Sequence, residues 1–185
     1  MALDYLALIE EHSRTIEAMK NECLPDISRF AENCREALAS GHTIYLMGNG
    51  GSVCDCQHFA AELVGRFQKE RQAMAAVALT TDTAILTALA NDYTFDIVFS
   101  RQIEALARAG DVVVGLSTSG NSPNVLKGFL AAKERGAVTI GLTGHSGGKM
   151  KGLCDVCIRI PSDVTARIQE AHLLVEHLVC QRIEE

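Results

Sequence analysis

The sequence lacks a basic cluster, an apolar run of membrane length and a leader-like start, and each absence excludes a class of protein. Its formal net charge is −6, so nucleic acid and anionic membranes are not expected as partners. No apolar run approaches the roughly 20 residues that cross a bilayer. The first residues, MALDYLALIEEHSRT, are amphipathic and charged. We therefore expect the seven cysteines to be reduced, in a cytoplasmic protein without a disulfide framework.

Two short motifs are also incomplete. Cys154 and Cys157 form one C-x-x-C, but no second pair stands at zinc-ribbon spacing, so we interpret both as small core residues. The glycine turn GNGGSV at 48–53 is not G-x-G-x-x-G, and no acidic residue ends the strand that follows. A dinucleotide-binding dehydrogenase is therefore disfavoured.

No repeat, linker or low-complexity stretch divides the 185 residues, which predicts a single domain over 1–185. Hydrophobic residues make up 48% of the chain and the mean hydropathy is +0.11, an apolar excess that indicates a buried subunit interface. Residues 1–40 have the spacing of two amphipathic helices, and they precede the first strand. We expect these two helices to pack in an oligomer, and residues 41–185 to hold the sheet core and the C-terminal helix.

Short apolar runs alternate with helical patterns along the rest of the chain. They predict five strands, near 44–47, 75–79, 111–116, 137–142 and 156–160. A further helix is expected at 85–90, ended by Asn91 and Asp92, and another at about 96–107. The order of elements predicts an α/β fold: a doubly wound, mainly parallel five-stranded sheet flanked by helices, with two N-terminal helices. In such sheets, ligands bind along the edge where the strands end.

Two turns at that edge have the composition of a phosphate site. Residues 48–52, GNGGS, join the first strand to a helix, where glycine lets backbone N–H groups approach an anion closely. Residues 117–123, STSGNSP, place four hydroxyls at the start of another helix. Hydroxyls and N–H groups bind phosphate without a fixed positive charge. A turn or helix cap of purely structural purpose is the alternative for each.

Polar residues also recur at helical spacing near both ends of the chain. Cys54, His58 and Glu62 stand at four-residue steps and share one face of a helix. Gln169 and His177, on the final helix, differ in direction by about 80° and can converge on one point. If the two helices meet, these side chains form a site. If they do not, His58 and Glu62 are an ordinary pair on a solvated surface.

With these features together, the chain resembles the sugar-isomerase (SIS) domain family, and within it the isomerases of seven-carbon sugar phosphates. The resemblance covers essentially the whole sequence. It is carried by GNGGS at 48–52, QHFAAELVGRF at 57–67, the turn Asn91-Asp92-Tyr93, GLSTSGNSPN at 115–124, LTGHSGGK at 142–149 and RIQEAHLLVEH at 167–177.

The resemblance implies an aldose–ketose isomerase that converts D-sedoheptulose 7-phosphate to D-glycero-D-manno-heptose 7-phosphate through an enediol, the first step of heptose biosynthesis. It implies Glu62 and His177 as the acid/base pair. It also implies that Asn91, Asp92, Gln169 and Glu62 contact the sugar. The phosphate would be held by the two turns, through Asn49, Gly50, Gly51, Ser52, Ser117, Thr118, Ser119 and Ser122.

The same resemblance implies one zinc ion per subunit and a homotetramer with the N-terminal helices at its centre. The metal ligands would be His58, Glu62, Gln169 and His177, of which the glutamine amide is the weakest donor. Two questions stay open: whether Cys54 joins the metal, and whether Glu62 can serve as both ligand and base.

Two other functions are compatible with the fold. A non-catalytic SIS-domain binding protein, of the type that associates with the replication initiator, would lack the carboxylate and second imidazole that Glu62 and His177 supply. A sugar-phosphate-sensing regulator would need a DNA-binding domain, for which 185 residues leave no room.

Overall fold

Five parallel strands form one sheet, in the order β2-β1-β3-β4-β5, in the computed structural model of the chain. The structure describes residues 3–185, so Met1 and Ala2, which begin the expected helical segment 1–40, lie outside the described residues. The expected doubly wound parallel sheet is confirmed. The strands are β1 (Ile44–Gly48), β2 (Ala76–Ala78), β3 (Val112–Ser117), β4 (Val138–Thr143) and β5 (Val156–Arg159).

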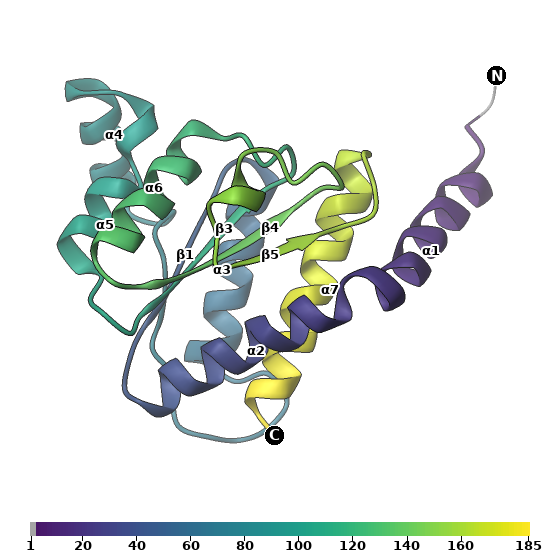
Figure 1. Ribbon diagram of the computed structural model, residues 1–185, viewed down its shortest axis with the longest axis horizontal. Coiled ribbons are helices and arrows are strands. Elements are labelled where there is room, and N and C mark those ends of the chain that lie inside the picture. Colours follow the sequence, from purple (N-terminus) through teal and green to yellow (C-terminus); the bar gives the residue numbers. More distant parts are fainter. Residues whose placement is uncertain (1–2) are drawn as a thin grey trace.

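Helices cover both faces of the sheet (Figure 1). The first strand shows why, since its alternate side chains point to opposite faces. Leu46 belongs to a core shared with α2, α3 and α7, whereas Met47 belongs to a core shared with α5 and α6. The helices are α1 (Tyr5–Glu22), α2 (Leu24–Ala39), α3 (Gly51–Val64), α4 (Thr83–Asp92), α5 (Ser100–Leu106), α6 (Pro123–Glu134) and α7 (Thr165–Ile183).

The strand order places both candidate phosphate turns side by side. The chain leaves β1 toward β2 on one side and later returns to form β3 on the other, so the order reverses between β1 and β3. In the parallel register Gly48, the last residue of β1, is opposite Leu116 of β3. The turns that follow these strands therefore flank the switch point, where ligands bind in open α/β sheets.

Element boundaries differ from the sequence-based expectations around residue 92. The helix expected to end before Asn91 and Asp92 does not do so, because α4 continues through Asp92. The Asn91 side chain donates to the Asp92 carboxylate at 2.9 Å and does not compete for the backbone. The single helix expected over 96–107 is instead a 3-10 turn, η1 (Phe95–Ile97), followed by α5.

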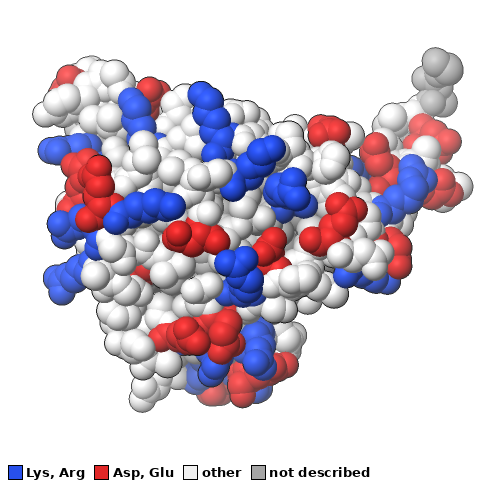
Figure 2. All heavy atoms as spheres, viewed as in Figure 1, with Lys and Arg blue, Asp and Glu red and all other residues white. Residues whose placement is uncertain are grey.

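The first helix extends away from the sheet (Figure 1). Its N-terminal half leaves apolar side chains in solvent. Tyr5 is 71% exposed, Leu6 65% and Ile9 62%, while Met19 near the other end is buried. Among the described residues, no helix has the length and apolar character that a bilayer crossing requires. Figure 2 shows basic and acidic side chains interspersed over the face seen in Figure 1.

Candidate active site

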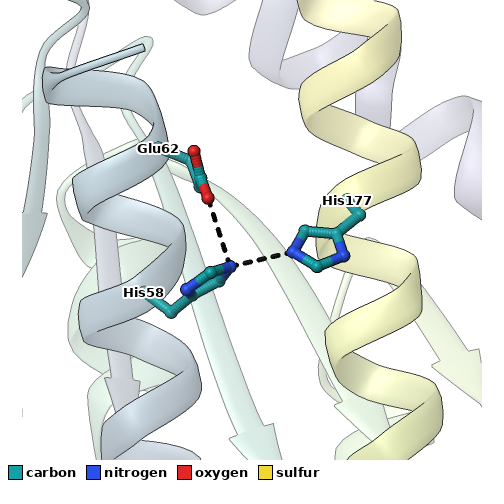
Figure 3. A group of neighbouring side chains, drawn as sticks. All are labelled: His58, Glu62 and His177. Carbon is teal, nitrogen blue, oxygen red and sulfur yellow. Dashed lines mark hydrogen bonds and ion pairs between the residues drawn. The ribbon is translucent and has the colours of Figure 1, made fainter. Parts of the chain in front are cut away.

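Three ionisable side chains from distant parts of the chain converge between α3 and α7 (Figure 3). The Nε2 atoms of His58 and His177 are 2.9 Å apart, and Glu62 Oε1 lies 3.4 Å from His58 Nε2. Among the described residues this is the one group of histidine, cysteine and carboxylate side chains close enough to share a metal ion, with one donor atom of each within 4.8 Å of the others. The structure thus brings His58 and Glu62 of α3 to face His177 of the final helix.

Packing of the two helices decides which side chains meet. Phe59 and Leu63 of α3 and Val175 of α7 are buried in one core. Because successive residues of a helix are rotated by about 100°, this burial turns His58 and Glu62 toward the adjoining face, where they are half-buried. Each polar side chain is therefore held at the edge of an apolar contact.

The donor atoms fit a transition metal such as zinc. Two imidazole nitrogens and one carboxylate oxygen are ordinary zinc donors. Nitrogens bound to one tetrahedral zinc lie about 3.4 Å apart, given bonds of about 2.0–2.1 Å. The 2.9 Å separation here therefore needs only a small side-chain adjustment. Cys54, one turn before His58, is exposed and does not belong to the group.

Gln169 lies at the glycine turn. Gly50 is the N-cap residue before α3 and has φ +57°, in the left-handed region that favours glycine; Gly51 is the first residue of the helix. A Cβ on Gly51 would collide with the Gln169 side-chain amide, so the absent side chain makes room for that amide. Gln169 therefore links α7 to the first of the two turns.

The second turn gathers its hydroxyls in one place. Ser117 Oγ lies 2.8 Å from Ser122 Oγ and 3.4 Å from Ser119 Oγ. Ser122 precedes α6 and makes no side-chain cap bond to that helix. Backbone N–H groups in the first turn of a helix lack partners within the helix and carry about half a positive charge, which favours an anion. Ser52 in the first turn is buried.

A cavity of ≈ 350 Å³ opens beside the second turn. Thr118 and Ser119 line it together with His145, Ser146 and Asp163, which sequence reasoning did not select. The three missed residues come from loops that follow β4 and β5, so the strand-end rule that found the two turns also applies to them. Gly144 N–H donates to Thr118 O at 3.0 Å and joins two of these loops.

Asn49 has its side chain engaged within the protein. Its amide exchanges two hydrogen bonds with the amide of Asn124, at 2.9 and 2.8 Å. Asn124 is 3% exposed, and its Oδ1 also accepts the Val125 N–H at 3.0 Å. The pair fastens the two turns to each other. Nothing in the sequence indicates this pairing of Asn49 with Asn124, because the two residues are 75 positions apart.

Asn91 and Asp92, expected to contact the sugar, lie at the exposed end of α4. Figure 1 shows α4 on the opposite side of the sheet from α7. Within one chain, the structure does not bring these two residues to the group on α3 and α7.

The core face of α7 holds two polar groups that the site does not use. His172 is fully buried, with Nε2 3.4 Å from Thr143 O, and burial lowers its pKa to about 4. Glu176 is 1% exposed, and burial, reinforced by the nearby charge of Asp55, raises its pKa well above the usual range. His172 is therefore neutral near pH 7, and burial favours the protonated form of Glu176.

Comparisons with known proteins agree over nearly the whole chain. The model of the SIS domain matches residues 7–144. A phosphoheptose isomerase of Geobacter sulfurreducens is 52% identical over 182 residues, covering 98% of this chain and 96% of the relative. A solved phosphoheptose isomerase from Neisseria gonorrhoeae has a TM-score of 0.92 and 46% identity, covering 97% and 96%. One from Francisella tularensis has a TM-score of 0.93 and 34% identity, covering 96% and 94%.

Replacing Asn124 tests whether the amide pair organises an anion site. We expect Asn124→Ala to weaken binding of inorganic phosphate about tenfold, because the two turns lose their tie, and to lower the free energy of unfolding by about 1–3 kcal/mol. Calorimetric titration and urea unfolding measure the two effects. Asn33→Ala, on α2, is the matched control. Unchanged phosphate affinity in Asn124→Ala would show that the pair has no part in anion binding.

Proposed function

The chain belongs to the SIS domain family, and we propose that it is a phosphoheptose isomerase, which interconverts D-sedoheptulose 7-phosphate and D-glycero-D-manno-heptose 7-phosphate. The observation that carries the proposal is the meeting of His58, Glu62 and His177 between α3 and α7. It occurs in a chain about half identical to phosphoheptose isomerases along nearly its whole length.

The spacing along α3 suits a seven-carbon substrate. From Gly51 at the glycine turn to His58 the helix rises by about 10 Å, at 1.5 Å per residue. An extended heptulose 7-phosphate places phosphorus roughly 9 Å from the carbonyl carbon, over seven single bonds in a zigzag chain. A phosphate bound by the two turns therefore leaves the carbonyl end of the sugar beside Glu62 and His177.

The reaction moves one proton between carbons and one between oxygens. In the ketose-to-aldose direction, the Glu62 carboxylate removes a proton from C1 and returns it to C2 of the enediol. His177 accepts the proton of the C1 hydroxyl and supplies one to the oxygen on C2. Each role contributes about 10²- to 10⁴-fold in rate as general acid or base catalysis. Phosphate contacts from Ser52, Ser117, Thr118, Ser119 and Ser122 hold C1 and C2 of the sugar beside Glu62 and His177.

We propose that His58, Glu62, Gln169 and His177 hold one zinc ion per subunit. When bound, the metal would polarise the substrate carbonyl and stabilise negative charge on the neighbouring oxygens. Glu62 has two carboxylate oxygens, and Oε1 is the one that faces His58. The other oxygen would then be the one that takes the carbon proton.

The non-catalytic alternative is not favoured. A binding protein of the replication-initiator-associating type does not need Glu62 and His177, yet both are present and lie in one group. The relatives at about half identity carry the name of an isomerase.

We further propose a homotetramer in which the N-terminal helices pack centrally. The apolar side chains of Tyr5, Leu6 and Ile9 are supporting observations, since each is more than 60% exposed in one chain. A neighbouring chain would also be the source of any sugar contact from Asn91 and Asp92. The seven cysteines are all free, which is in keeping with a cytoplasmic, reducing environment, and no nucleic acid or membrane partner is proposed.

Glu62→Gln tests the catalytic assignment. We expect kcat with sedoheptulose 7-phosphate to fall by about 10²- to 10⁴-fold, because the amide cannot take the carbon proton. Glu70→Gln is the matched control, since the side chain of Glu70 is 91% exposed. A coupled assay of product formation measures both variants. Full activity in Glu62→Gln would remove the acid/base role, and an inactive wild type with every metal tried would favour the binding-protein alternative.

Metal content tests the ligand set. We expect the purified protein to hold about one zinc ion per chain, and dialysis against a chelator to remove both metal and activity. His58→Ala should lose the ion. Cys54→Ser, on the same stripe, should keep it. Elemental analysis by mass spectrometry measures the content, and metal loss in Cys54→Ser would bring that thiol into the site.

Sedimentation velocity tests the tetramer. The wild type should sediment as four chains at micromolar concentration, and the double variant Leu6→Glu/Ile9→Glu should dissociate, because it buries charges in an apolar contact. Arg14→Glu, at an exposed and charged position of the same helix, should stay assembled. A monomeric wild type would refute the proposed assembly.

A further inference from the structure

The loop that follows α3, residues 65–72, crosses the C-terminal part of α7 and places an aromatic ring on the proposed acid/base histidine. The rings of Phe67 and His177 are stacked, with centroids 5.6 Å apart and planes 27° from parallel. On another side His177 meets the ring of His58, with centroids 5.1 Å apart and an angle of 66°. The His177 imidazole is therefore confined between two rings, with Nε2 directed at His58.

Glu184 near the end of α7 fixes the position of Phe67. Its carboxylate accepts the backbone N–H groups of Phe67 at 3.1 Å and of Gln68 and Lys69 at 2.9 Å. Only 2% of the Glu184 side chain is exposed. Burial alone would raise its pKa, but the three N–H donors and the Arg71 guanidinium outweigh burial and lower the pKa to about 2. The anchor is therefore ionised wherever an isomerase would operate.

Arg71 joins the same anchor to the end of α3. Its Nε donates to Glu184 at 2.9 Å. Its Nη atoms donate to the backbone carbonyls of Glu62 at 2.7 Å and Leu63 at 2.9 Å, which belong to the last turn of α3 and have no partner within the helix. The Arg71–Glu184 ion pair thus fastens the last turn of α3, which carries Glu62, to the end of α7, the helix that carries His177.

We infer that Phe67 is a positioning residue for His177 and that Glu184 and Arg71 hold Phe67 in place. The stacked ring limits rotation of the imidazole and shields one of its faces from water, so that Nε2 keeps its direction toward His58. Offset stacking of two aromatic rings is a modest interaction, which predicts a modest and specific loss of rate when it is removed. The kinetic part of this inference rests on the proposed isomerase activity.

The first test is structural and needs neither metal nor substrate. In metal-free protein with ¹³C-labelled histidine, a ring stacked on His177 shifts its Cε1 proton resonance upfield, and the resonance is assigned by its absence in His177→Gln. We expect this shift in the wild type and in Phe67→Tyr, and its loss in Phe67→Leu. An unshifted resonance in the wild type would overturn the inference, whatever the activity.

The second test separates positioning from substrate binding. In Phe67→Leu we expect kcat to fall about two- to twelvefold, the range of a lost aromatic pair, with KM changed less than twofold. Phe67→Tyr, which keeps an aromatic ring at this position, should keep the kcat of the wild type. An unchanged kcat, or a rise in KM alone, would overturn the positioning role.

The third test addresses the anchor. Glu184→Gln should weaken the ring-current shift and lower kcat in the same direction as Phe67→Leu. Glu185→Gln is the matched control at the neighbouring exposed position, and it should change neither. A wild type that turns over, with Glu184→Gln folded by circular dichroism and unaltered in both readouts, would refute the anchor. If no protein in the series turns over, the proposed function fails while the resonance still reports the stacking.

Discussion

The packing of α3 against α7 is the contact on which the site depends. Both helices start at the edge where the strands end and share one core through Phe59, Leu63 and Val175. That apolar contact fixes how each helix is rotated about its axis. Rotation in turn decides that His58 and His177, 119 residues apart, point at each other. A site built in this way inherits its precision from the hydrophobic core, because close-packed side chains leave few alternative rotations.

Much of this arrangement follows from periodicity, and what does not follow consists of single contacts between distant residues. Alternating apolar runs predict the parallel sheet, and four-residue steps place His58 and Glu62 on one face of a helix. No period marks Asn124 as the partner of Asn49, or Glu184 as the anchor of residues 67–69. Each depends on where two remote segments come together in space. The end of α4 differs from the expectation for a local reason, since Asn91 bonds to the neighbouring Asp92 side chain instead of breaking the helix.

The proposed anion site lies in an acidic chain. The charge of −6 provides no general attraction for phosphate. Local groups would provide it instead: hydroxyls within hydrogen-bond distance at Ser117 and Ser122, and two helices whose N-cap residues make no side-chain cap bond. Asn49 is used to join the two turns, so the amide shapes the site from within. Such an arrangement binds by position, because dipoles and hydroxyls act only at short range.

The Glu184 carboxylate, which supports the proposed acid/base pair, keeps its charge down to low pH. The pKa of Glu184 is lowered from an ordinary 4.5 to about 2, by three backbone N–H groups and Arg71 acting against the effect of burial. Because the folded protein lowers this pKa, the ionised carboxylate stabilises the fold at pH values above about 4.5. That stabilisation is lost as the pH falls from about 4.5 toward 2. Near neutral pH the Arg71–Glu184 anchor is therefore intact, and the ring of Phe67 stays in place beside His177.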